Sequence, residues 1–245
     1  MNVIVLKDES QVCEKASKII GNVVKENPNA FLGLATGSSA EKVYEYLVED
    51  YKKGNLDFSK CTSVNLDEYV GLSPDHPQSY RKYMDDKFFN KVNINKDNTY
   101  VPVTINNIEE ELKRIKNLIN EKGGTDVQLL GVGGNGHIAF NEPGEFLNAS
   151  VSVVDLDEKT IKANSRFFDS VDDVPKKAVS LGIGDILKSK KIVLVAFGVG
   201  KKEAIKNLLT NDFITTKVPC TLLKAHRDVT VIIDEELAQE SGYKF

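Results

Sequence analysis

A histidine, an amide and a carboxylate lie close together in a glycine-rich segment near the middle of the chain. Asn135, His137 and Glu142 fall within or just after the run Gly131–Gly136. The run matches G-x-G-x-x-G, but that fingerprint must open a long helix, and the proline and glycine after Glu142 end any helix within about one turn. We therefore reject a dinucleotide site. A histidine that a carboxylate and an amide can orient is suited to acid or base chemistry.

Two adjacent carboxylates, Asp67 and Glu68, follow the apolar run Ser63–Leu66. Ligands of parallel α/β sheets bind beyond the carboxyl ends of the strands, so catalytic groups are expected at such a position. Adjacent side chains on an extended backbone point in opposite directions, so at most one of the two faces a site. The residues do not say which one, and on their own they favour a solvated turn with an aspartate cap.

A short hydroxyl-rich turn lies between the apolar run Phe31–Leu34 and a helix that we expect from about Ala40. Free N–H groups and the positive end of the helix dipole converge at such a turn, which suits it to bind a phosphate. The alternative is that Ser39 merely caps the helix. A P-loop is excluded because no Gly-Lys-Ser/Thr follows. The candidate phosphate ligands are Thr36, Gly37, Ser38 and Ser39.

Two cations, Arg166 and Lys201, are candidates to complete a phosphate site. Lys201 follows the apolar run Ile192–Phe197 and opens a predicted helix, where a cation is unfavourable unless an anion lies there too. Arg166 by itself is typical of a solvated surface residue. The formal net charge is -4, so an anion must be held by a few local cations and backbone N–H groups.

The segments that position these residues alternate between short apolar runs and stretches with helical spacing. Runs that are apolar throughout predict strands covered on both faces, and strands alternating with helices predict a parallel sheet. We predict an α/β fold with a single doubly wound, mostly parallel sheet and helices on both faces. The expected strands are Val3–Leu6, Phe31–Leu34, Ser63–Leu66, Val127–Gly131, Val151–Val154, Ile192–Phe197 and Val229–Ile233, and helical spacing is clearest in 12–23 and 108–119.

Length and composition set the remaining bounds. The chain has 245 residues, 41% of them hydrophobic, and neither a repeat nor a linker, so we predict one domain over residues 1–245. The three cysteines suggest neither disulfides nor a zinc site. No apolar run approaches the ~20 residues that span a bilayer, and charge follows the first apolar residues too soon for us to expect a signal peptide. We expect a soluble cytoplasmic protein without nucleic-acid or membrane partners, and a long loop, a candidate lid, over Leu72–Tyr80.

Taken together, these segments resemble the glucosamine-6-phosphate deaminase family, a group of glucosamine/galactosamine-6-phosphate isomerases. The run His137–Pro143 is far more specific to that family than the glycine pattern before it. The resemblance implies a fold of the sugar-phosphate isomerase type and a reaction without metal or cofactor. It extends along the whole chain and rests on residues 32–38, 65–72, 76–80, 131–144 and 163–168.

The resemblance also implies a role for each candidate residue. His137, oriented by Glu142 and Asn135, opens the sugar ring as an acid and base, and Asp67 then moves a proton from C2 to C1. The products of glucosamine 6-phosphate are fructose 6-phosphate and ammonia, as in the catabolism of N-acetylglucosamine. We therefore predict a hydrolase that acts on a cyclic amino-sugar phosphate. The implied phosphate ligands are residues 36–39, Arg166 and Lys201.

Two other functions fit parts of the sequence. A 6-phosphogluconolactonase-like hydrolase would share the phosphate loop and a histidine in a glycine-rich loop, but it needs no base at C2. A non-catalytic sugar-phosphate sensor would keep the phosphate loop without the acid and the base. Residues 65–69 and 140–143 resemble the deaminase and not the lactonase, and the presence of Asp67, His137 and Glu142 argues against the sensor.

The resemblance further bears on regulation. Hexameric, allosterically activated members of the family bind N-acetylglucosamine 6-phosphate through a basic pair in the strand before residues 163–168. This chain has Ser152 and Val154 there, followed by Asp155. We therefore expect no such activation, and a monomer or small homo-oligomer whose partner is a small-molecule sugar phosphate.

Overall fold

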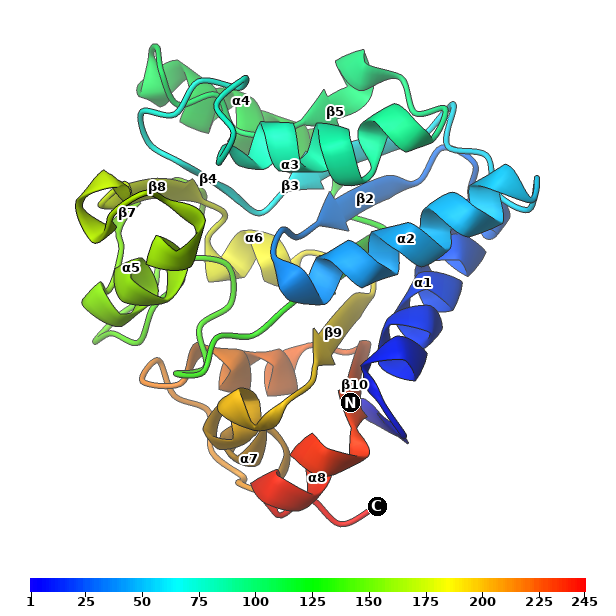
Figure 1. The fold of residues 1–245 in the computed structure, drawn as a ribbon, viewed down its shortest axis with the longest axis vertical. Helices are drawn as coiled ribbons and strands as arrows, with labels where there is room; N and C mark the ends of the chain where they lie inside the picture. Colours follow the sequence, from blue (N-terminus) through cyan, green and yellow to red (C-terminus); the bar gives the residue numbers. More distant parts are fainter.

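The computed structural model describes the backbone of residues 1–245 and all side chains except those of Lys159, Ala163 and Phe167; two of these belong to the 163–168 stretch. Its centre is a seven-stranded sheet in which all neighbouring strands run parallel (Figure 1). In spatial order the strands are β1 (Asn2–Leu6), β10 (Val229–Asp234), β9 (Ile192–Ala196), β6 (Val127–Leu130), β2 (Phe31–Leu34), β3 (Thr62–Asn65) and β5 (Thr99–Tyr100).

The helices begin and end where the sequence supplies caps and apolar faces. The Asp8 side chain accepts a hydrogen bond from the Gln11 N–H at the start of α1, and α4 ends at Gly123 in the left-handed conformation. The helices are α1 (Glu9–Glu26), α2 (Ser38–Lys52), α3 (Tyr80–Lys87), α4 (Ile108–Lys122), α5 (Glu158–Asn164), α6 (Ile183–Leu187), α7 (Lys202–Leu209) and α8 (Glu235–Ser241), with 3₁₀ turns η1 (Phe89–Lys91), η2 (Lys96–Asn98), η3 (Ser165–Phe167), η4 (Val171–Asp173), η5 (Val199–Lys201) and η6 (Pro219–Ala225).

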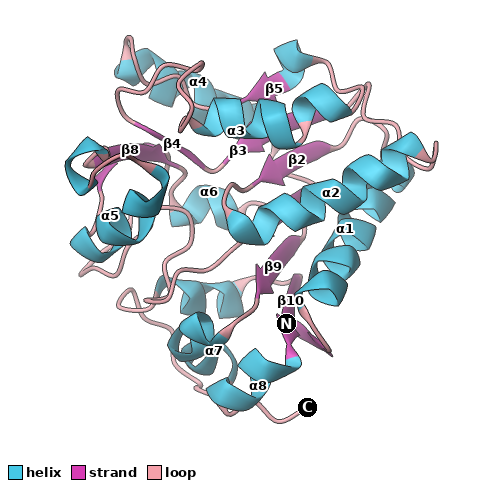
Figure 2. Cartoon of the chain, viewed as in Figure 1, coloured by secondary structure: helices cyan, strands magenta, loops and turns pink.

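The strand order reveals two opposite directions of winding. From β1 through β2 and β3 the chain moves to the β5 edge, and from β5 it returns through β6 and β9 to β10. Since crossovers between parallel strands are right-handed, α1–α3 lie on one face and α4, α6 and α7 on the other. The predicted doubly wound α/β fold is confirmed (Figure 2). The direction reverses between β2 and β6, where ligands bind in sheets of this kind.

Three further strands form a small separate sheet that the sequence did not predict. β4 (Asp67–Tyr69) and β7 (Ser152–Asp155) both pair antiparallel with β8 (Lys177–Ser180). Burial alternates along β7, as it does in a strand with one solvated face. The expected strand 151–154 is therefore present, but it lies outside the parallel sheet. None of the helices that the structure describes is long and apolar enough to cross a membrane.

Candidate active site

A cavity of about 800 Å³ opens at the point where the winding reverses. Loops after β2, β3 and β6 form one side, and α5, η3 and η5 contribute from the other. The sequence-predicted residues come together here from five separate segments of the chain. Those that line the cavity are Thr36, Gly37, Ser38, Ser39, Asp67, Asn135, His137, Arg166 and Lys201, and Glu142 lies behind His137, in hydrogen-bond contact with it.

The phosphate-loop candidate is the connection from β2 to α2. Helix α2 begins at Ser38, with Gly37 as its N-cap at φ +100°, and no side chain caps it. Only glycine adopts this φ without strain, and the space beside its Cα is open for 4 Å. Ser39 therefore lies in the first turn, and the alternative that it merely caps the helix is wrong. Gly37, Ser38 and Ser39, at the start of α2, line the cavity, and the N-terminus of a helix is the position that an anion site requires.

Lys201 and Arg166 bring two positive charges to the cavity. Lys201 ends η5 and immediately precedes α7, as the sequence predicted. Burial, and then repulsion from Arg166, lowers the pKa of Lys201 below its ordinary value. An anion beside Lys201 and Arg166 would offset this repulsion.

The carboxylate of Glu142 fixes the orientation of His137. Nδ1 of His137 lies 3.1 Å from Oε2 of Glu142, and the Asn135 amide donates to the same oxygen over 2.8 Å. The Asn135 carbonyl oxygen accepts from the His137 backbone N–H at 3.1 Å. Since a carboxylate only accepts, we assign the proton to Nδ1, which leaves Nε2 as the basic nitrogen. Gly133 makes room for the ring, because an added Cβ would lie 2.4 Å from His137 Cε1.

Asp67 and Glu68 are both buried, at 7% and 2% exposure, so the solvated turn that the residues alone favoured is wrong. Pairing of β4 with β8 shields them from water. They point in opposite directions, and of the two only Asp67 lines the cavity. Burial, and then repulsion from Glu68, raises the pKa of Asp67 to about 8. Burial also raises the pKa of Glu68 to about 7, although backbone N–H groups partly oppose this.

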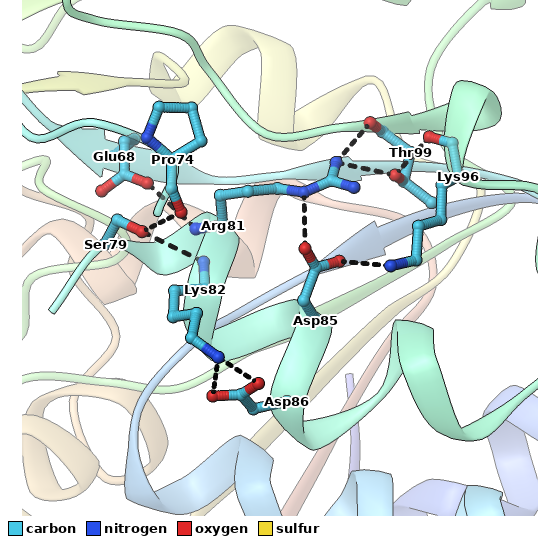
Figure 3. A network of polar contacts seen from close by, with 9 residues as sticks. All are labelled: Glu68, Pro74, Ser79, Arg81, Lys82, Asp85, Asp86, Lys96 and Thr99. Carbon is cyan, nitrogen blue, oxygen red and sulfur yellow. Dashed lines mark hydrogen bonds and ion pairs between the residues drawn. The ribbon is translucent and has the colours of Figure 1, made fainter. Parts of the chain in front are cut away.

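Glu68 instead joins β4 to the start of α3 (Figure 3). Its carboxylate accepts hydrogen bonds from the N–H of Tyr69 at 2.9 Å and of Arg81 at 3.0 Å. Ser79 caps α3 and donates to the Pro74 carbonyl over 2.8 Å, which closes the predicted loop 72–80 onto itself. Residues 77–79 of that loop line the cavity. Its role as a lid stays a prediction.

Sequence reasoning missed the contacts that α5 makes with this site. Thr160 donates to Oε1 of Glu142 over 2.5 Å, and the Asn164 amide donates to the Tyr69 hydroxyl over 2.8 Å. The Tyr69 ring also contacts Phe168 and other aromatic rings around the cavity. The available signal was the spacing of Thr160 and Asn164, which places both on one helical face.

Comparison with known proteins agrees with this geometry. A family model described as glucosamine-6-phosphate isomerases/6-phosphogluconolactonase matches residues 8–232. A glucosamine-6-phosphate deaminase of Clostridium perfringens (strain 13 / Type A) is 50% identical over 98% of this chain and 99% of its own length. A solved monomeric glucosamine-6-phosphate deaminase has a TM-score of 0.94 and 42% identity, covering 98% of this chain and 100% of that one. A 6-phosphogluconolactonase from Thermotoga maritima, at TM-score 0.73 and 22% identity over 95% and 98% of the two chains, shares the fold.

The relatives correct one prediction made from the sequence. We predicted a hydrolase, but the relatives with high identity are deaminases, so that class is wrong. The prediction took the addition of water as the defining step of the reaction. The reaction is instead defined by the isomerisation and the loss of the amine. The predicted family itself is confirmed. With a family model matched over residues 8–232 and a relative 50% identical along nearly its full length, this chain belongs to the glucosamine-6-phosphate isomerase/6-phosphogluconolactonase family.

Proposed function

We propose that this protein converts glucosamine 6-phosphate and water into fructose 6-phosphate and ammonia. One observation carries the proposal: a buried carboxylate and a carboxylate-oriented histidine share a cavity with two cations and a helix N-terminus. These are the groups needed to move a proton beside a carbonyl carbon while a phosphate is held. The relative at 50% identity is named for this activity.

The substrate's phosphate binds at the start of α2, between Arg166 and Lys201. The first-turn N–H groups of the helix donate to its oxygens, and the two cations balance its charge. The dianion offsets the repulsion from Arg166 that, after burial, lowers the pKa of Lys201. Binding at this end fixes the position of the sugar carbons relative to Asp67 and His137.

His137 opens the sugar ring. Its Nε2 takes the proton of the C1 hydroxyl and a proton passes to the ring oxygen, so that the C1–O5 bond breaks and an aldehyde forms at C1. Glu142 stabilises the imidazolium through Nδ1, because its carboxylate lies 3.1 Å away and is itself held by Asn135.

Asp67 then transfers a proton between two carbons. Its carboxylate removes the proton from C2, which the neighbouring aldehyde makes acidic, and returns it to C1. A proton from the C2 amine passes to the C1 oxygen, which becomes a hydroxyl as the amine becomes an imine. Water then adds to C2, and ammonia leaves to give the ketone. A raised pKa suits this role, because a stronger base accepts a carbon-bound proton more readily. Each step uses a side chain of this protein or water, with no metal or cofactor.

We also propose that the protein acts as a monomer or small homo-oligomer without a second sugar-phosphate site. The relative with 42% identity is described as monomeric. On β7, the positions expected of an activator site carry Ser152 and Val154. The next residue, Asp155, is exposed and forms an ion pair with Lys177 at 2.9 Å. A phosphate placed there would meet the carboxylate of Asp155, and the nearby cation Lys177 is already paired with that carboxylate.

The direct test is incubation of the purified protein with glucosamine 6-phosphate. We expect ammonia and fructose 6-phosphate in equal amounts, and no acid release from 6-phosphogluconolactone above its spontaneous rate. Turnover of the lactone without ammonia release from the amino sugar would instead assign the chain to the lactonase branch of its family.

A further inference from the structure

Both carboxylate oxygens of Glu142 are committed to hydrogen bonds. Oε2 contacts His137 Nδ1 at 3.1 Å and the Asn135 amide at 2.8 Å, whereas Oε1 accepts from the Thr160 hydroxyl at 2.5 Å. The side chain of Glu142 is 12% exposed, so little water reaches it. Three donors from two parts of the chain, the glycine-rich loop and α5, thus define the plane of this carboxylate.

Thr160 holds Glu142 from a separate element of the fold. It lies in α5, is 6% exposed and lines the cavity. One turn later in the same helix, Asn164 bonds to the Tyr69 hydroxyl, and Tyr69 is in the strand that carries Asp67. The helix therefore makes two side-chain contacts with the site, and of the α5 side chains that the structure describes, Thr160 is the one that bonds to the carboxylate that orients His137.

We propose that Thr160 is a positioning residue for the reaction: its hydroxyl holds the Glu142 carboxylate in the plane that keeps the proton of His137 on Nδ1 and Nε2 free to act. The assignment of a step to His137 rests on the proposed function. The geometry of the contact does not.

Electrostatics at Glu142 agree with this role. Burial alone would raise the pKa of Glu142, but the hydrogen bond and charge of His137, followed by the bonds from Thr160 and Asn135, lower it overall. Without the hydroxyl, Oε1 keeps no protein donor among the described contacts of Glu142. The carboxylate can then rotate toward water, and His137 loses its fixed partner.

The other two histidines provide an internal standard. Nδ1 of His76 accepts from the Gln78 N–H, and Nδ1 of His226 accepts from the Asp228 N–H, both at 3.1 Å. Each of these rings therefore carries its proton on Nε2 when neutral. Among the three histidines of the chain, His137 is the one with its proton on Nδ1.

The test compares Thr160→Val, which keeps the shape, with Thr160→Ser, which keeps the hydroxyl. Thr125→Val is the matched control, because it removes a buried hydroxyl that bonds to Ser189 at 2.8 Å away from the cavity. We measure kcat and KM for glucosamine 6-phosphate, the melting temperature, and the histidine tautomers by ¹⁵N NMR of the whole protein without substrate.

We expect Thr160→Val to lower kcat by ~10- to 100-fold with KM within about threefold of the wild type, as for loss of a bond to a charged group. Thr160→Ser recovers most of kcat, Thr125→Val leaves it unchanged, and the His137 spectrum of Thr160→Val alone becomes a mixture of tautomers. A Thr160→Val protein with wild-type kcat, or one whose His137 tautomer is unchanged, overturns the proposal. A third outcome separates this proposal from the proposed function. If the wild type does not turn over glucosamine 6-phosphate, but Thr160→Val still changes the His137 tautomer, the proposed function is refuted and the positioning contact stands.

Discussion

The charge of Glu68 has a consequence for the pH dependence of catalysis. Consecutive Cα atoms are ~3.8 Å apart and the side chains of Asp67 and Glu68 leave opposite faces of β4, which puts their carboxyl groups roughly 7 Å apart. At an effective dielectric constant of about 20, two unit charges at that distance interact by about 2.4 kcal/mol, or about 1.7 pKa units. Glu68 is itself only partly ionised near neutral pH, so the effect of removing its charge is about one to 1.7 units.

We predict that Glu68→Gln lowers the pKa of Asp67 from about 8 toward 7. Asp67 must be ionised to accept a proton, so kcat/KM rises with pH through its pKa. Removing the negative neighbour therefore moves this rise to lower pH. Burial remains, and because it is the larger cause, the pKa stays above that of an ordinary aspartate.

The assay is initial ammonia release at low substrate concentration between pH 5.5 and 9, which reports the free enzyme. The substrate amine titrates in the same range, so the comparison is between variants. Asp85→Asn is the control, because Asp85 is a carboxylate of the same network, bound to Arg81 at 3.3 Å, that does not line the cavity. A Glu68→Gln profile that superimposes on the wild type, with an unchanged melting temperature, refutes this explanation of the Asp67 pKa.

Three further predictions concern the phosphate end, the histidine and regulation. Arg166→Ala and Lys201→Ala should each raise KM for glucosamine 6-phosphate by ~10- to 100-fold, since each removes a charge-assisted contact. The rise in KM should be smaller for unphosphorylated glucosamine, and an equal rise for both sugars contradicts the assignment. Gly133→Ala should lower kcat by about tenfold or more, because its Cβ would overlap the His137 ring. Gly200→Ala is the control, since an added Cβ meets nothing within 4 Å there. Equal activities of the two variants would refute the steric argument. Rate against substrate should be hyperbolic and unchanged by N-acetylglucosamine 6-phosphate, and a sigmoidal curve that this compound makes hyperbolic would refute the absence of a second site.

The parts of the site that follow long apolar strands were predictable from the sequence. The runs that became β2, β6 and β9 are buried throughout, so their ends and the turns after them could be located from composition. The residues after these strands therefore fall at one edge of the sheet, and the candidate set meets in one cavity.

Features that depend on long-range pairing were not predictable in the same way. β4 is three residues long and two of them are acidic, so no pattern marked it as a buried strand. Its burial comes from β8, more than one hundred residues away in the chain, as the pairing of Glu68 with Val179 shows. The contact between Thr160 and Glu142 is hidden for the same reason, because a threonine in a polar helix has no periodic signal that names its partner.

The role of Asp67 as the base that moves the C2 proton is the central claim, and Asp67→Asn tests it most directly. The measurement is turnover of glucosamine 6-phosphate carrying deuterium at C2, with ammonia quantified and the C1 position of fructose 6-phosphate followed by NMR. We expect the wild type to deliver part of the deuterium to C1, and Asp67→Asn to lose ~10²- to 10⁴-fold in kcat while it binds the substrate with nearly unchanged affinity. A loss smaller than tenfold, with deuterium still transferred to C1 in the variant, would contradict the account.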